Sequence, residues 1–236
     1  MIVLHPHQQE MRDAIMAARR AKKKRILLQS PTGSGKTVIA GSLAQGAQNH
    51  GLKLWFVVHR IELVRQSMNA FSSMGVDFGV IAPGFTPRQC SVQIAMVGSL
   101  ARRKHNYPPP NVIMADEAHH AVAKTWQNLF DAYPKVGIIG LTATPQRLDG
   151  KGLGSVFDTL IPGPSVRWLI DNRFLSPFRA FSPPAVAELD GLHMRGGDFR
   201  SDEIQSAMNK PTITGDAIGH YKRLAGGMQM IVFCAG

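Results

Sequence analysis

The sequence predicts an α/β fold in which a mostly parallel sheet is covered by helices on both faces. Short apolar, β-branched runs alternate with longer segments of helical periodicity, as in chains built from β-α-β units. Several apolar runs, such as Leu54 to Val58, lack polar alternation, as expected for strands that are buried on both faces. A length of 236 residues, of which 44% are hydrophobic and 18% charged, is sufficient for a large core.

The expected elements alternate along the first part of the chain. Strands are predicted at Arg25–Gln29, Lys53–Val58, Phe78–Ile81, Val92–Val97, Asn111–Ala115 and Val136–Leu141. Helices are predicted at Pro6–Ala21, Lys36–Gln48, Ile61–Met74 and Ala123–Asp131. Pro6 is suited to a first helical turn, where its missing N–H has no partner to lose. Gly150, Gly152 and Gly154 indicate a loop.

The last part of the chain has a different composition. The segment from Leu160 to Pro184 contains five prolines and is predicted to be an interdomain passage. Further elements are predicted as a short helix at Ser201–Glu203, a helix at Thr212–Ala225 and a strand at Met230–Cys234. A strand that opens a sheet and then stops suggests an unfinished domain. We therefore expect one domain over residues 1–175, followed over residues 176–236 by a linker and the incomplete start of a second domain.

The charge balance favours a polyanionic partner. Lys and Arg number 27 against 16 Asp and Glu, which gives a formal charge of +11. Such an excess suits nucleic acid, and it equally suits simple solubility. The apolar stretches are shorter than the ~20 residues of a membrane span, and the N-terminus lacks a secretory pattern, so we expect a cytoplasmic protein. Cys90 and Cys234 are distant from each other and form no metal-binding pair.

A phosphate-binding loop is predicted after the first strand. The run Pro31-Thr32-Gly33-Ser34-Gly35-Lys36-Thr37 follows a strand and opens a helix. Glycines allow the backbone N–H groups to face phosphate oxygens, and the helix N-terminus adds a positive dipole end. Lys36 provides a charge for the β- and γ-phosphates, and Thr37 provides a hydroxyl ligand for Mg²⁺. Ser30 stands where the strict pattern has glycine.

An acidic pair follows a later strand. Asp116 and Glu117 end the apolar run that begins at Asn111. Ligands of open parallel sheets bind at the carboxyl ends of the strands, so this pair and the glycine-rich loop are expected to face one crevice. Asp116 can hold Mg²⁺, and Glu117 can deprotonate an attacking water. An acidic pair at a strand end can also serve only as a helix cap.

The three ordered motifs P-T-G-S-G-K-T, D-E-A-H and T-A-T-P resemble the motor of superfamily 2 helicases. The run G-L-T-A-T-P-Q-R-L-D-G-K-G-L resembles the branch with phage-type DEAD/DEAH helicases and restriction-enzyme motor subunits. The resemblance implies a RecA-like P-loop NTPase lobe that uses ATP and Mg²⁺. It implies that nucleotide is bound by Pro31, Thr32, Gly33, Ser34, Gly35, Lys36 and Thr37, that Thr37 and Asp116 hold the metal, and that Glu117, Lys36 and His119 are catalytic. Thr142 and Thr144 would couple the nucleotide state to a second lobe and to the nucleic acid.

Other matches are shorter. Leu4-His5-Pro6-His7-Gln8 resembles the family's L-R-x-Y-Q, whose glutamine reads adenine, with His5 and His7 in place of Arg and Tyr. Arg60 lies in a segment that resembles the first nucleic-acid motif. Ser99 and Arg102 lie in one that resembles a second such motif. Gln8 can also be an ordinary exposed helix residue, and the basic residues around Arg102 can be a solvated patch.

These observations predict an ATP-dependent helicase or translocase lobe that acts on nucleic acid, with DNA favoured over RNA. Motors of this family take arginine fingers from a second lobe, and the later arginine-bearing motifs are absent from this sequence. We therefore expect slow hydrolysis by this chain alone, with a partner subunit or a second lobe supplying the arginines. Two alternatives remain, which are an ATPase motor subunit of a restriction system and a nucleotide-gated nucleic-acid-binding module without catalysis.

Overall fold

The chain divides into two compact units, Met1–Ser176 and Pro177–Gly236. The computed structural model describes residues 3–145, 152–181, 193–195, 198–199, 203 and 211–232. Within these residues, no helix is both long enough and apolar enough to cross a bilayer.

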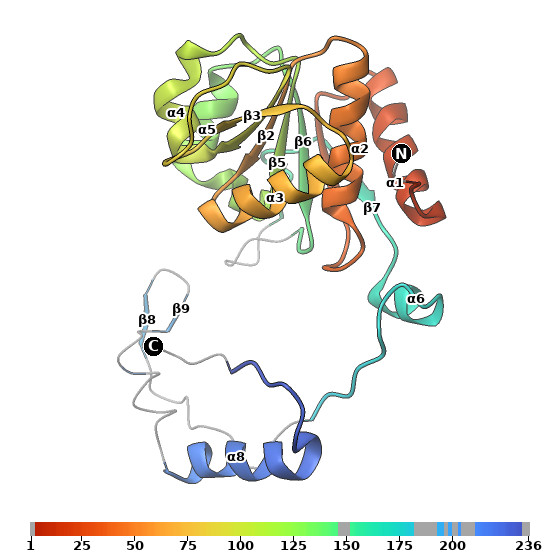
Figure 1. The fold of residues 1–236 in the computed structure, drawn as a ribbon, viewed down its shortest axis with the longest axis vertical. Helices are drawn as coiled ribbons and strands as arrows, with labels where there is room; N and C mark the ends of the chain where they lie inside the picture. The colour runs from red at the N-terminus through yellow and green to blue at the C-terminus, as the bar shows by residue number, and fades with distance from the viewer. Residues whose placement is uncertain are drawn as a thin grey trace. The chain divides into compact units, whose positions relative to one another are not determined.

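The first unit is built around one sheet (Figure 1). Its seven described strands follow the order β3-β4-β2-β5-β6-β1-β7, and all neighbouring strands are parallel. The strands are β1 (Arg25–Gln29), β2 (Leu54–Val58), β3 (Phe78–Ile81), β4 (Val92–Met96), β5 (Val112–Asp116), β6 (Gly137–Thr142) and β7 (Thr159–Pro162). All five residues of β2 are buried, because helices cover both faces of the sheet.

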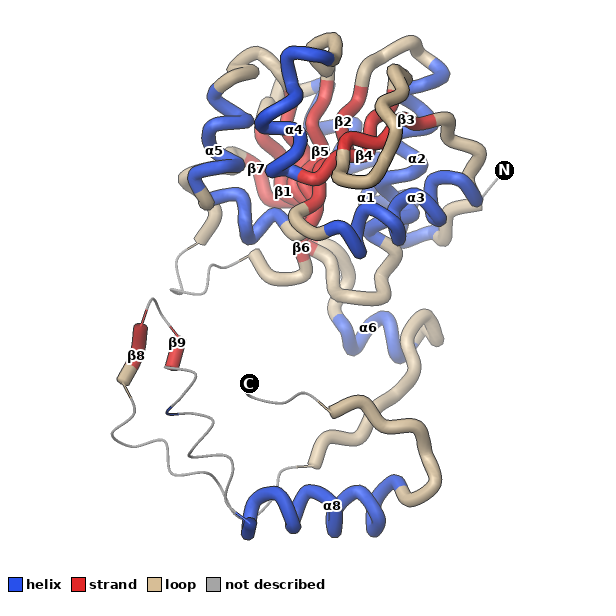
Figure 2. The backbone as a smooth tube through the Cα atoms, turned by 60° about the vertical axis from the view of Figure 1, so that its left-hand side comes forward, coloured by secondary structure: helices blue, strands red, loops and turns tan. Residues whose placement is uncertain are grey.

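Helices form a layer on each side of the sheet (Figure 2). On one side lie α1 (Pro6–Arg20), α2 (Lys36–Asn49) and α3 (Ile61–Ser73), and on the other lie α4 (Val97–Arg103) and α5 (Lys124–Asp131). Alternate strand residues contribute to two cores. Leu54 and Phe56 pack with the α1–α3 side, whereas Trp55 and Val57 pack with the α4–α5 side. The predicted α/β fold is therefore confirmed.

Local sequence explains where α1 begins and which face it buries. Pro6 occupies the first turn, and Arg19 and Arg20 lie in the last turn, where positive charge suits the helix dipole. Met11 and Ile15 are four residues apart, so they lie on the same face and are buried against the sheet.

The proline-rich segment differs from its prediction. Leu160–Pro184 was expected to be an interdomain passage, but it begins inside β7 and continues into α6 (Val166–Asp171). Pro162 is compatible with β7 because it is the last residue of this edge strand, and the following Gly163 N donates to Gln29 O at 2.6 Å in place of the N–H that proline lacks. The predicted fourth strand also ends one residue early, since Val97 begins α4.

The second unit has few described elements. Two short antiparallel strands, β8 (Met194–Arg195) and β9 (Asp198–Phe199), pair with each other, and α8 spans Pro211–Ala225, close to the predicted Thr212–Ala225. The predicted strand at Met230–Cys234 is not present in its described part, because Met230–Val232 has no regular structure and pairs with no described strand. Phe233 and Cys234 lie outside the described residues, as do Ser201 and Asp202 of the expected short helix.

Candidate active site

The loop between β1 and α2 has the conformation that its glycines predict. Gly33 and Gly35 have φ angles of +82° and +90°, in the left-handed region that favours glycine. Gly35 is the N-cap residue of α2, so the helix N-terminus opens directly from the loop. A Cβ at Gly33 would lie 2.6 Å from Leu175 Cδ2, and one at Gly35 would overlap the Gln8 amide nitrogen. Both positions therefore favour glycine for their backbone conformation, and a larger residue would also have to displace the end of the Leu175 or Gln8 side chain.

Ser30 replaces the expected glycine without opening the loop. It is fully buried, and its Oγ donates to Ser34 Oγ at 2.7 Å. Ser34 Oγ in turn donates to Pro31 O at 2.7 Å. Gly163 leaves the room for this hydroxyl, because a Cβ there would be 2.8 Å from Ser30 Oγ. The departure from the strict motif is thus accommodated by a hydrogen-bonded serine pair.

Lys36 points back into the loop. Its Nζ donates to Ser30 O at 2.9 Å and to Pro31 O at 3.2 Å. Burial lowers the pKa of Lys36, and the charges of Glu117 and Asp116 oppose this shift. The ammonium and both carboxylates therefore lie within electrostatic reach of one another. The cause is topological, since β1, β6 and β5 are adjacent parallel strands whose carboxyl ends meet at one edge.

The acidic pair follows β5 in two different environments. Asp116 ends the strand, and burial together with the charge of Glu117 raises its pKa to about 6. Glu117 is left-handed, with φ 49° and ψ 53°, a conformation that is strained for a residue with a side chain. Its carboxylate remains one-third exposed. Asp116 is thus partly buried and desolvated, whereas Glu117 keeps part of its carboxylate in solvent.

His119, Thr142 and Thr144 form a polar connection beside Glu117. His119 Nδ1 lies 3.3 Å from Glu117 Oε2 and 3.4 Å from Thr142 Oγ1. Thr142 Oγ1 donates to Thr144 O at 2.8 Å and accepts from Thr144 N at 3.2 Å. The D-E-A-H and T-A-T-P segments, which are 23 residues apart at His119 and Thr142, are therefore in direct contact.

Gln8 is buried and its amide is already engaged. Its Oε1 accepts from His5 N at 3.0 Å, and its Nε2 donates to Ser34 O at 3.2 Å. His7 Nε2 lies 3.3 Å from the same Ser34 oxygen. Both side chains thus join the start of α1 to the glycine-rich loop. Gln8 is not the exposed helix residue of the alternative interpretation.

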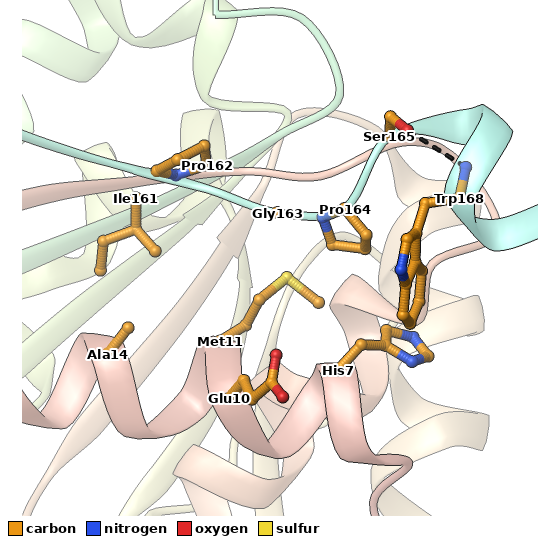
Figure 3. A pocket seen from close by; sticks show the side chains of 10 residues that line it. All are labelled: His7, Glu10, Met11, Ala14, Ile161, Pro162, Gly163, Pro164, Ser165 and Trp168. Atoms are coloured by element: carbon orange, nitrogen blue, oxygen red, sulfur yellow. Dashed lines mark hydrogen bonds between the residues drawn. The ribbon is translucent and has the colours of Figure 1, made fainter.

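An aromatic cluster that the sequence analysis missed lies next to His7. The rings of Trp168 and Phe174 lie 5.8 and 4.4 Å from the His7 ring, centroid to centroid. Figure 3 shows Trp168 above His7 at one end of a cavity of about 670 Å³, which Glu10 and Met11 also line. The sequence did not predict this contact, because Trp168 follows His7 by 161 residues. The pairing of β7 with β1 places the segment that carries Trp168 next to the first unit's N-terminal helix.

The three residues expected to contact nucleic acid have different environments. Arg60 is exposed at the N-cap of α3, and Arg102 is exposed in the last turn of α4. Ser99 is fully buried, and its Oγ has no hydrogen-bond partner among the described residues. Nucleic acid cannot reach the Ser99 hydroxyl in this conformation, because α4 packs that side chain into the core.

Comparison with known proteins identifies the family of this chain. The family model described as "Type III restriction enzyme, res subunit" matches residues 1–147. A 51.5 kDa protein of a Lactococcus phage is 34% identical over 207 residues, which cover 88% of this chain and 43% of that protein. IRC3 of Saccharomyces cerevisiae, named as a candidate ATP-dependent helicase, is 32% identical over 232 residues, which cover 89% of this chain and 33% of that protein.

A solved structure supports the same fold. The nuclease-deletion mutant of the Type ISP restriction-modification enzyme LlaGI, in complex with a DNA substrate mimic, aligns with a TM-score of 0.61 at 14% identity. The alignment covers 73% of this chain and 21% of that one. The chain thus spans less than half the length of the relatives and of the structure described here. Because the family model matches well over half of its sequence, the chain belongs to the family of type III restriction enzyme res subunits.

Proposed function

We propose that this chain is the ATP-binding lobe of an ATP-dependent helicase or translocase that acts on DNA. One observation supports this most strongly, which is the meeting of Lys36, Asp116 and Glu117 at the carboxyl edge of adjacent strands. A phosphate-binding loop alone would suit many NTPases. The T-A-T-P contact with His119, together with the family membership, favours a nucleic-acid motor.

The residues suit Mg-ATP as substrate and metal. Gly33 and Gly35 keep the loop open for phosphate oxygens, and among the described residues Lys36 Nζ bonds only to two loop carbonyls, which it can exchange for phosphate. Thr37 and Asp116 would hold Mg²⁺, which neutralises charge on the phosphates when it is bound. No set of three or more His, Cys, Asp or Glu side chains in the described part of the chain forms a metal cluster. Magnesium in nucleotide sites needs only one or two such protein ligands.

Glu117 is the proposed catalytic base. Its partly exposed carboxylate can accept a proton from water, and His119 Nδ1 lies 3.3 Å from its Oε2. Lys36 would bind the phosphates of ATP and Thr37 would bind the metal. Thr142 and Thr144 connect His119 to the end of β6. Gln8 supports the loop through Ser34, and we keep it as an adenine contact through its remaining amide hydrogen.

Arg60 and Arg102 are the proposed nucleic-acid contacts, supported by their exposure and by the net charge of +11. Residues 176–236 are proposed to be a linker and the start of a second RecA-like lobe. Arginine fingers from such a lobe contribute roughly 10³–10⁵ in turnover, so slow hydrolysis is expected from these 236 residues alone.

A restriction motor is the second candidate. The description of the matching family and the likeness to a Type ISP enzyme favour it. Such a motor would acquire DNA cleavage from a nuclease that is not seen in the described residues. Nuclease assays with candidate partner subunits distinguish it from a helicase.

Binding of a fluorescent ATP analogue with Mg²⁺ tests the main proposal. Lys36→Ala removes the ammonium that faces both carboxylates, so affinity is expected to fall by about tenfold or more, since a charge-assisted hydrogen bond contributes about 1.5–3 kcal/mol. The control is Lys124→Ala, which removes an exposed lysine at the start of α5 and should leave affinity unchanged. Equal affinities of Lys36→Ala and the unsubstituted chain would overturn the nucleotide site.

A further inference from the structure

We propose that His59 and His120 are positioning residues that transmit nucleic-acid binding at Arg60 to the carboxylate of Glu117. Together with His119 they form what we call the histidine bridge. The inference rests on the proposed function, and it assigns a role to two residues for which the sequence predicted none.

The bridge is a continuous series of contacts. The His59 and His120 ring centroids are 4.4 Å apart, and those of His120 and His119 are 4.2 Å apart. His119 then reaches Glu117 Oε2 at 3.3 Å. At the other end, Arg60 follows His59 directly in the chain. The series therefore connects an exposed arginine with the proposed base.

Sheet topology brings the two ends together. β2 and β5 are neighbouring parallel strands, paired from Leu54–Val112 to Val57–Ala115. The turn after β2 carries His59, and the short helix η2 (Ala118–Val122) after β5 carries His119 and His120. Because both turns leave the same edge of the sheet, the rings meet although His59 and His120 are 61 residues apart.

The contact between the rings favours neutral imidazoles. Burial lowers the pKa of His59, and Arg60 lowers it further, while Glu117 opposes the shift. Burial also lowers the pKa of His120, followed by the charges of His119 and His59. The acidic groups that face the bridge are Glu62 and Glu117. Two uncharged rings can pack in these tilted arrangements, with interplanar angles of 52° and 46°, without the repulsion that two imidazolium ions would create.

His59 also has an unused hydrogen-bonding atom. Its Nδ1 is buried and has no hydrogen-bond partner among the described residues. A groove of about 430 Å³, lined in part by His59, Arg60 and His120, opens beside it. A backbone phosphate held by Arg60 would thus lie next to a ring that no hydrogen bond fixes. A shift of that ring moves His120 and His119, and so changes the support of a glutamate whose backbone is strained.

The experiment measures coupling between two ligands. Affinity for a fluorescent ATP analogue with Mg²⁺ is determined for the 236-residue chain with and without a single-stranded oligodeoxynucleotide, and the ratio of the two affinities is the coupling factor. His59→Ala and His120→Ala are each expected to reduce this coupling factor about fivefold, or to abolish the coupling so that the factor becomes 1. His120→Phe keeps a ring in place and should restore it. His50→Ala, which changes an exposed histidine at the end of α2, is the matched control.

A spectroscopic readout separates positioning from simple stabilisation. The ring C–H signals of His119 should shift when the oligonucleotide is added to the unsubstituted chain, and should not shift in His120→Ala. If circular dichroism shows that an alanine variant is unfolded, the glutamine variant at the same position (His59→Gln or His120→Gln) replaces it, since glutamine keeps a polar side chain but no ring.

The outcomes distinguish the two levels of the argument. A full coupling factor in both alanine variants would overturn the bridge while leaving the ATP site intact. So would a chain that binds the analogue but shows no coupling to the oligonucleotide. Failure of the unsubstituted chain to bind the analogue would overturn the proposed function itself, and the bridge with it.

Discussion

Glu117 shows at the scale of one residue how function and strain occur together. A left-handed conformation costs a residue with a Cβ about 1–2 kcal/mol, and Glu117 adopts it immediately after β5. The conformation ends the strand abruptly and leaves the carboxylate one-third exposed beside His119. A relaxed, extended residue would continue along β5. The left-handed conformation therefore ends the strand at the residue whose carboxylate contacts His119.

Glu117→Gln is expected to bind ATP as the unsubstituted chain does but to hydrolyse it about 10²–10⁴-fold more slowly, because an amide of equal size cannot accept the proton. Single-turnover hydrolysis and analogue binding, measured on the same samples, test this. Glu10→Gln alters an exposed glutamate of α1 and should hydrolyse normally. Normal hydrolysis by Glu117→Gln would remove Glu117 from the role of base.

Asp116 predicts a pH-dependent stability. Its pKa of about 6 in the folded chain lies above the 3.8 of an ordinary aspartate, so between these two pH values the folded chain holds a proton that the unfolded chain has lost. The free energy of unfolding therefore falls as the pH rises from 3.8 to about 6, because the folded chain must then ionise a desolvated carboxyl. Above this range the destabilisation has its full value. In metal-free buffer, Asp116→Asn should raise the free energy of unfolding at pH 7 by roughly 1–3 kcal/mol.

This gain should shrink as the pH approaches 4, where the native carboxyl is also neutral. Urea unfolding at both pH values measures it, with the exposed Asp158→Asn as the control. An advantage of Asp116→Asn that stays constant across the pH range would contradict the burial of a charged carboxylate.

At the scale of an element, the end of α1 is held by a lysine where glycine is usual. Lys22 has φ +60°, Lys22 N donates to Arg19 O at 3.0 Å, and Lys23 N donates to Ala18 O at 3.1 Å. These are the two hydrogen bonds of a Schellman motif. The basic run Lys22–Arg25 thus also provides cations at the negative end of the helix dipole.

Lys22→Gly should stabilise the first unit by about 0.5–1 kcal/mol, because glycine adopts the left-handed conformation without a Cβ penalty. Chemical denaturation followed by circular dichroism measures the change. Ala21→Gly is the matched control, since Ala21 has φ −74° and gains nothing from glycine. It should destabilise the chain. Loss of stability in both variants would show that the lysine side chain contributes more than the backbone costs.

The elements that the sequence predicted well are those with strong local signals. β1 and β3 agree in both bounds with their predictions, because each is a short apolar run between polar turns. β7 and α6 were missed, because the prolines of this segment favoured a loop in the prediction. In addition, β7 is a strand through its pairing with β1, which no local pattern shows. A strand at a sheet edge depends on a partner that lies more than a hundred residues away in the sequence.

At the scale of the whole molecule, the charge of +11 predicts binding that depends on salt. Each phosphate contact releases counterions, so the logarithm of DNA affinity should fall linearly with the logarithm of salt concentration. Arg60→Ala should reduce the magnitude of this slope by about 1, which corresponds to the loss of one phosphate contact. Fluorescence anisotropy at several salt concentrations measures the slope. Arg88, which pairs with Asp77 at 2.7 Å, provides the control Arg88→Ala. A slope near zero would indicate a partner other than nucleic acid.

The sequence by itself determined six of the seven described strands of the sheet-bearing unit, four of its helices, the glycine-rich loop and the acidic pair. These features depend on residues that are neighbours in the chain, since periodicity and turn chemistry act over a few residues. Only the tertiary structure decided that Ser99 is buried, that the Gln8 amide is engaged by Ser34, and that His59 meets His120. Those outcomes depend on which strands pair and which faces are covered, and such long-range packing leaves no local pattern in the sequence.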